Sequence, residues 1–134
     1  MSKSLIQVAN QSIQTVAANS IVSLGSVLRR FGCNLRLSGN AIEAEGQGYY
    51  SVDACVTVLP TAAGTVTVAL YENGVPISGA ISTGSVSTAG NPVTLPINTT
   101  FRMGCGCDGA DSLTLVLITG AGTVSNVSMR IVKE

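Results

Sequence analysis

The sequence predicts an all-β fold, an antiparallel sandwich or jelly roll of about eight to ten short strands. Thirty-eight of the 134 residues are Val, Ile or Thr, whose branched side chains suit a pleated sheet and disfavour a helix. Fifteen glycines supply turns between the strands. A chain of this length can bury a core without disulfides or metals, so we expect one domain over residues 1–134.

The segment 49–59 shows the clearest strand pattern. Hydrophobic residues alternate there with small or polar ones, and the hydrophobic set is Tyr50, Val52, Ala54, Val56 and Val58. A period of two over ten residues assigns one face to the core and fixes the register of the strand. We therefore expect Tyr50 in the core and Tyr49 on the opposite face.

A hairpin is expected at Asn73-Gly74, after an alternating strand at 65–71. A type I′ turn needs positive φ at both central residues, which Asn and Gly adopt most readily. Residues 75–80 would form the return strand. Pro76 within it predicts an edge position, because proline cannot donate to a strand ladder.

Further strands are expected in the C-terminal half. Residues 81–88 alternate weakly, and 93–103 read as a strand interrupted at Pro96. The segment 112–119 is apolar on both faces, as a central buried strand would be. The segment 123–132 ends the domain and places on one side Val127, Met129 and Ile131.

The first 45 residues are harder to assign. Short strands are expected at 5–9, 13–16 and 35–37. Between residues 20 and 31 the pattern fits strand and also a helix with an apolar stripe at Ile21, Leu24, Leu28 and Phe31, although Gly25 disfavours the helix. Residues 1–40 are expected either as extra strands of the jelly roll or as an N-terminal arm.

Composition excludes several classes of function. The chain has seven basic residues, seven acidic residues and no His. Zero net charge gives no attraction to nucleic acid or to an anionic membrane, and no apolar run of about 20 residues could span a bilayer. Without His, neither a Ser-His-Asp hydrolase nor a His-ligated zinc enzyme can be built. We expect a non-enzymatic protein without a cofactor that binds neither nucleic acid nor a membrane.

The cysteines give a weak signal for a site. Cys33 and Cys55 stand alone, whereas Cys105 and Cys107 share a glycine-rich loop. A four-thiolate zinc site, disulfides and free thiols all stay open, with free thiols favoured because pairs with zinc-finger spacing are absent.

The remaining charged residues are interpreted as surface groups. Asp108 and Asp111 are too few to supply a calcium ion with its six to eight oxygen ligands. Glu43 and Glu45 share a face if that segment is a strand. We expect them to pair, within or between subunits, with the basic cluster of Arg29, Arg30 and Arg36.

The neutral exterior predicts self-association. Between residues 54 and 101 only Glu72 is charged, and residues 112–129 carry no charge. Monomeric β proteins usually protect their edges with charges, and a net charge near zero lowers solubility. Ser and Thr could hydrate such a surface, but burial between subunits explains it better, and cyclic symmetry achieves that burial without forming fibres. We expect a homotrimer.

The segments 48–52 (GYYSV) and 66–76 (VTVALYENGVP) resemble the C1q/TNF-like jelly-roll superfamily, in which a Gly-x-Tyr strand is followed by a strand ending in an Asn-Gly hairpin. The resemblance covers residues 41–134. Its short, neutral, Val- and Thr-rich form is similar to small proteins of phages and prophages and to the tips of spore-surface collagen-like proteins. It implies a ten-stranded jelly roll that forms homotrimers, although no Gly-X-Y stem is present in the preceding residues.

Two functions follow. The first is a structural protein of a phage virion, a trimeric capsid decoration or part of a head or tail fibre, with the major capsid protein or another virion protein as partner. The second is a module of the same fold, on a virion or on a bacterial cell or spore surface, that binds a carbohydrate or another receptor. Candidates for interface or ligand contacts are Tyr49, Tyr71, Phe101, Arg29 and Arg30.

Overall fold

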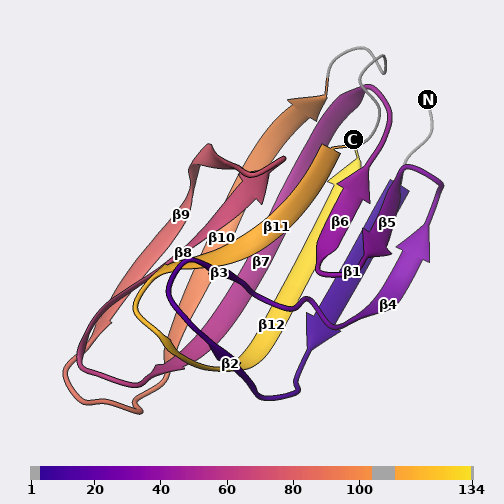
Figure 1. The fold of residues 1–134 in the computed structure, drawn as a ribbon. Helices are drawn as coiled ribbons and strands as arrows, with labels where there is room; N and C mark the ends of the chain where they lie inside the picture. Colours follow the sequence, from indigo (N-terminus) through magenta and orange to yellow (C-terminus); the bar gives the residue numbers. More distant parts are fainter. Residues whose placement is uncertain (1–3, 104–110, 134) are drawn as a thin grey trace.

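The computed structural model of the chain describes residues 4–103 and 111–133, and its regular elements in these ranges are all β-strands (Figure 1). Twelve strands form two antiparallel sheets that pack face to face. No described segment is a helix long and apolar enough to cross a membrane.

Sheet A has the order β10-β7-β12-β1-β4, and β2 also pairs with β12. Its strands are β1 (Ser4–Asn10), β2 (Gln14–Val16), β4 (Ser26–Phe31), β7 (Gly48–Pro60), β10 (Val93–Met103) and β12 (Gly122–Lys133).

Sheet B has the order β5-β6-β11-β8-β9, and β3 also pairs with β11. Its strands are β3 (Ser20–Ile21), β5 (Leu35–Ser38), β6 (Ala41–Ala44), β8 (Gly64–Glu72), β9 (Val75–Val86) and β11 (Asp111–Thr119).

The core lies between the sheets and follows the alternation of the sequence. The expected inward residues of β7, from Tyr50 to Val58, are buried, and so are Val127, Met129 and Ile131 of β12. The central strand β11 contributes Leu113, Leu115 and Leu117 from sheet B. Burial of each large aliphatic side chain contributes about 1.5–3 kcal/mol, which makes these alternating residues the main source of stability.

The hairpin between β8 and β9 is confirmed. Asn73 and Gly74 have φ values of 53° and 83°, and Glu72 pairs directly with Val75. Both central residues thus adopt the positive φ of a type I′ turn. The strand β9 lies at the edge of sheet B, as Pro76 predicted.

The N-terminal residues are the part of the chain for which the sequence left the structure most open. Residues 20–31 form β3 and β4 rather than a helix, because the intervening Val22 and Leu24 insert into the core and β4 pairs with β1. The strands β1 to β5 lie within the two sheets, so residues 4–38 form strands of the sandwich rather than an arm. They also raise the strand number among the described residues to twelve.

The remaining differences between prediction and structure concern where the strands are interrupted. The segments 75–80 and 81–88 form largely one strand, β9, and β10 runs through Pro96 without a break. Gly84 lets β9 approach β10, since a β-carbon there would lie 2.6 Å from Val93 Cγ2. Figure 1 shows these two strands at the same lateral side of the sandwich.

Each edge strand carries a feature that opposes strand pairing between molecules. Pro96 lies in β10, Pro76 in β9 and the Arg29-Arg30 pair in β4, while β5 has only four residues. Prolines, charges and short length are common protections of exposed edges. Association through added strands is therefore disfavoured, and the sheet faces are the better candidates for contact.

Candidate interaction surface

The outward face of sheet A is built from every second residue of five strands. Antiparallel pairing aligns these residues in rows that cross the sheet. One row joins Asn98 of β10 to Asp53 of β7, then Arg130 of β12, Gln7 of β1 and Arg29 of β4. We call these five residues the polar row.

An ion pair occupies the centre of the polar row. Arg130 Nη2 lies 2.7 Å from Asp53 Oδ2, and the two side chains are 53% and 50% exposed. In a solvated subunit such a pair contributes about 0–1 kcal/mol. The side chains of Asn98, Gln7 and Arg29 make no hydrogen bond or ion pair with the described residues. The charges at the centre of the row therefore cancel, and the outer side chains of Asn98, Gln7 and Arg29 are available to solvent or to a partner.

The rows on either side are less polar. Towards the chain termini the next row is Thr100, Ser51, Val132, Leu5 and Phe31. On the other side it is Pro96, Cys55, Ser128, Ala9 and Ser26, with no charged side chain. Phe31 is exposed, whereas Leu5 and Val132 are half-buried. The outward face of sheet A therefore alternates in polarity from row to row.

Two shallow depressions flank Asp53. One, of about 410 Å³, is lined by Ser51, Val52, Asp53, Asn98, Thr99 and Thr100. The other, of about 280 Å³, is lined by Gln7, Asp53, Ala54, Cys55, Ser128 and Arg130. Neither lining contains an aromatic side chain. A small-molecule site is usually a deep pocket lined by apolar and aromatic groups. These shallow, polar depressions are better suited to contact with the side chains of another protein.

The predicted contact residues occupy different places. Tyr49 is exposed on the outward face of sheet A, and the guanidinium carbon of Arg102 lies 5.9 Å from the centre of its ring. Tyr71 is half-buried on the outward face of sheet B, opposite Thr114 and Pro76. The two tyrosines therefore lie on opposite sides of the sandwich and do not form one site.

Phe101 differs from the expectation of a surface contact. It is only 6% exposed and stacks on Tyr50, with 5.0 Å between ring centroids and 5° between planes. The alternation of β10 explains this position, because Phe101 shares the inward face with Leu95 and Ile97. Its role within one subunit is packing.

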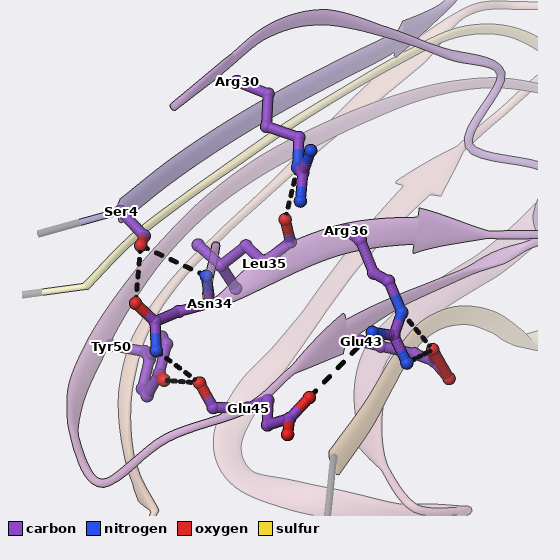
Figure 2. A network of polar contacts seen from close by, with 8 residues as sticks. All are labelled: Ser4, Arg30, Asn34, Leu35, Arg36, Glu43, Glu45 and Tyr50. Carbon is purple, nitrogen blue, oxygen red and sulfur yellow. Dashed lines mark hydrogen bonds and ion pairs between the residues drawn. The ribbon is translucent and has the colours of Figure 1, made fainter. Parts of the chain in front are cut away.

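The two arginines also separate. Arg29 belongs to the polar row, whereas Arg30 Nε donates to the backbone oxygen of Leu35 at 2.6 Å (Figure 2). This bond ties the edge of sheet A to the edge of sheet B. The expected pairing of the basic cluster with Glu43 and Glu45 is confirmed for Arg36 alone, at 2.7 Å and 3.9 Å.

A cluster of hydrogen-bonded polar groups closes the end of the sandwich near the termini, and Figure 2 shows its contacts among Ser4, Asn34, Glu45 and Tyr50. Ser4 Oγ donates to Asn34 Oδ1 at 2.8 Å, and Asn34 Nδ2 donates to the Glu45 carbonyl oxygen at 2.6 Å. The Tyr50 hydroxyl donates to the Gly46 and Glu45 carbonyl oxygens, at 2.8 Å and 3.2 Å. We call Ser4, Asn34, Glu45, Gly46 and Tyr50 the rim cluster.

Two carboxyl groups meet close to the rim cluster. A hydrogen bond that the protonated Glu72 carboxyl donates to Asp111, together with burial and the charge of Asp111, raises the pKa of Glu72 to about 7. Burial, with smaller contributions from the charges of Asp111 and Glu45, raises the pKa of Tyr50. Asn73 Nδ2 also donates to Asp111 Oδ1 at 2.9 Å, which links the β8–β9 hairpin to the start of β11.

The thiols and acidic groups described by the structure do not assemble a metal site. Cys33 is exposed and Cys55 half-buried, and both are free. Within 4–103 and 111–133, no three His, Cys, Asp or Glu residues gather closely enough to hold a metal ion. The expectations for Cys105, Cys107 and Asp108 concern residues outside the described ranges.

Three solved structures of other proteins share the architecture of this chain. Murine APRIL superposes with a TM-score of 0.77 at 14% identity, covering 99% of this chain and 100% of that one. The globular domain of zebrafish complement 1qA protein gives 0.63 at 8% identity, covering 93% and 94%. The PRD1 vertex protein P5 gives 0.58 at 15% identity, covering 97% and 96%.

The chain has the C1q/TNF-like jelly-roll fold. No family model matches the sequence, and no curated protein matches it either. The C1q/TNF-like fold is therefore recognised through its shape, at identities of 15% or less for these three neighbours.

Asp53, Asn98, Arg130 and Gln7 were not among the contact residues predicted from the sequence. A signal for two of them is present: Asp53 is the one charged residue in 49–59, and Arg130 is the one charged residue in 123–132. Only the pairing of β7 with β12 shows that the two charges meet.

Proposed function

We propose that the protein is a non-enzymatic structural protein of a phage virion, a homotrimeric capsid decoration or a component of a head or tail fibre. The observation that carries the proposal is the sparsely charged exterior of the C1q/TNF-like sandwich, in a chain of which only 10% of residues are charged. The strand β9 carries no charge, and the central outward face of sheet A carries one self-neutralising ion pair.

Large neutral faces with exposed apolar side chains are typical of protein interfaces. Ile81 and Val75 of β9 are 56% and 63% exposed, and Phe31 on sheet A is 56% exposed. The protected edges oppose open-ended strand addition, and a closed ring of subunits is the arrangement that buries such faces without growing into fibres. These features support a homotrimer.

The virion setting has support from one comparison. The PRD1 vertex protein P5 shares the fold over nearly the whole chain. A small, neutral chain without His is suited to a role in which shape and assembly, rather than chemistry, carry the function. The major capsid protein or another virion protein would be the docking partner.

Carbohydrate or receptor binding is the alternative. Tyr49 with Arg102 offers one aromatic platform, but neither depression on sheet A includes it. The two functions also make opposite demands on sheet A, since an interface covers the face that a glycan would need. We therefore favour assembly.

Two measurements test the proposal. Sedimentation equilibrium at micromolar concentration is expected to give three times the chain mass of 13.6 kDa. Mass spectrometry of particles purified from a phage that encodes the chain is expected to detect it as a stoichiometric component. A stable monomer contradicts the trimer, and a protein found on the bacterial cell or spore surface but not in particles contradicts the virion role.

A further inference from the structure

The tip of the β8–β9 hairpin combines a chemically reactive dipeptide with a side chain that is held in place. Asn73-Gly74 is the one Asn-Gly pair in the sequence, and both residues are exposed. Asparagine followed by glycine is the dipeptide most prone to spontaneous deamidation, because glycine has no β-carbon to shield its backbone nitrogen. The turn that the sequence predicted is therefore also a place where the chain can be modified.

The reaction requires the Asn73 carboxamide to rotate onto the peptide bond that follows it. The Gly74 nitrogen gives its proton to solvent and bonds to Asn73 Cγ. The Cγ–Nδ2 bond then breaks, and the departing group takes up a proton from solvent and leaves as ammonia. Water opens the resulting cyclic imide at either carbonyl, which gives aspartate or isoaspartate. One water is consumed and one ammonia is released, with no oxidant or reductant.

Strand β11 holds the carboxamide at both of its polar atoms. Asn73 Oδ1 accepts a hydrogen bond from the Ser112 backbone N–H at 2.9 Å, and Asn73 Nδ2 donates to Asp111 Oδ1 at 2.9 Å. The Asn73 backbone N–H also donates to the Ser112 carbonyl oxygen, at 2.8 Å. We call Asn73, Asp111 and Ser112 the hairpin contact. Because its three hydrogen bonds run to one neighbouring strand, they direct the carboxamide towards β11 rather than towards Gly74.

The product of deamidation does not fit the hairpin contact. An aspartate at position 73 has no side-chain N–H to donate to Asp111. Its negative charge would also lie beside Asp111, which already takes part in a hydrogen bond with Glu72, and like charges at this separation repel. Refolding cannot restore the contact, because the ammonia has left the protein.

We propose that Asn73 is a deamidation site that the hairpin contact keeps suppressed, and whose conversion to aspartate or isoaspartate loosens the β8–β9 hairpin irreversibly. The site lies within one subunit, so it is independent of the homotrimer and of the virion role. Each hydrogen bond of ordinary strength lowers the fraction of time that the carboxamide is free severalfold, so the loss of one bond changes the rate measurably.

The test measures the rate of modification at Asn73 by peptide mapping and mass spectrometry. The wild-type chain is incubated folded and, as a reference, unfolded in guanidinium chloride. Asp111→Ala removes the acceptor of Asn73 Nδ2, whereas Asp111→Asn keeps an oxygen acceptor without the charge. Asp53→Ala removes a half-exposed carboxylate of sheet A and is the matched control. Circular dichroism checks that each variant folds.

We expect modification of Asn73 to be at least tenfold slower in the folded wild type than in the unfolded chain. Asp111→Ala should be at least threefold faster than the folded wild type, and Asp111→Asn and Asp53→Ala should match it. Equal rates in the folded and unfolded wild type overturn the inference without any variant. An Asp111→Ala rate at or below that of the wild type also overturns it, because the carboxylate would then not suppress the reaction. Equal acceleration by Asp111→Asn assigns the effect to charge and has the same consequence.

Asn73→Asp reproduces the aspartate product directly. We expect it to lower Tm and to speed hydrogen exchange of the hairpin amides. Asn91→Asp is the control, because Asn91 is exposed before Pro92 and its side chain makes no hydrogen bond within the part of the chain that the structure describes. It should leave both measurements unchanged. A wild-type Tm and wild-type exchange in Asn73→Asp overturn the proposed loosening of the hairpin, and none of these outcomes affects the proposed function.

Discussion

The rim cluster and the polar row contain similar polar residues, but they differ in how far one subunit satisfies them. In the rim cluster, Asn34 bonds to both Ser4 and Glu45, and the Tyr50 hydroxyl has two carbonyl acceptors. In the polar row, one ion pair is made and the side chains of Asn98, Gln7 and Arg29 have no partner among the described residues.

This difference separates residues that hold the fold from residues available to a partner. Ser4 is fully buried, and the part of the chain that the structure describes contains no buried side-chain nitrogen or oxygen without a hydrogen bond. Internal saturation of this kind contributes to the stability of one subunit. Open polar groups on a neutral face contribute little until another surface covers them.

The largest effect on stability is expected from Asn34→Ala. The substitution removes the side-chain bonds of Asn34 to buried Ser4 and to the Glu45 carbonyl, which keep only the longer bonds from the Asn34 backbone N–H at 3.3 Å and the Tyr50 hydroxyl at 3.2 Å. The loss of two hydrogen bonds lowers the free energy of unfolding by about 2 kcal/mol. Urea unfolding of dissociated protein at low concentration measures it. Asn98→Ala in the polar row is the control and is expected to stay within about 0.5 kcal/mol of the wild type. Equal effects of the two substitutions would remove the distinction between the clusters.

A smaller loss is expected from Tyr50→Phe. The ring keeps its 5.0 Å stacking on Phe101, and only the hydroxyl bonds to Gly46 and Glu45 are lost. The free energy of unfolding should fall by about 1–1.5 kcal/mol, seen as a lower Tm in thermal unfolding. Tyr49→Phe is the matched change on the exposed face and should leave Tm unaltered.

The carboxyl pair beside the rim cluster predicts a pH dependence. The pKa of Glu72 is about 7 in the folded chain, against 4.5 for the unperturbed group, so the folded state binds more protons between these pH values. The contribution of this group is therefore complete below about pH 4.5 and is lost as pH rises to 7.

Because Glu72 is partly solvated, we expect a loss of only about 1 kcal/mol between pH 5 and pH 8. Glu72→Gln keeps a hydrogen-bond donor for Asp111 without the charge and should flatten this dependence. Urea unfolding at the two pH values measures it. A wild-type stability that rises through this range would contradict the assignment.

The smallest effect on the single subunit is expected from Asp53→Asn. The ion pair with Arg130 is half-exposed, so its loss should change the free energy of unfolding of the dissociated subunit by about 0–1 kcal/mol. The measurement is urea unfolding below the concentration of assembly. A loss of more than about 2 kcal/mol would assign Asp53 to the same role as the rim cluster.

The comparison also marks the limit of prediction from sequence for the candidate site. Arg29 and Phe101 were both predicted as interface or ligand contacts. Arg29 is exposed in the polar row, whereas Phe101 lies in the core. The alternation of β10 already places Phe101 on the side of Leu95 and Ile97. The composition of the row required strand neighbours that are far apart in sequence.

The sequence by itself determined the buried faces of β7 and β12, the Asn73-Gly74 hairpin and the sparsely charged exterior, because side-chain alternation, turn chemistry and composition are properties of the chain alone. Only the tertiary structure decided which strands are neighbours and at what offset. Asp53 and Arg130 are 77 residues apart, and their 2.7 Å contact depends on the register of β7 against β12. That register is fixed by the packing of the whole sandwich, since a period of two specifies a face but not the strand that lies beside it.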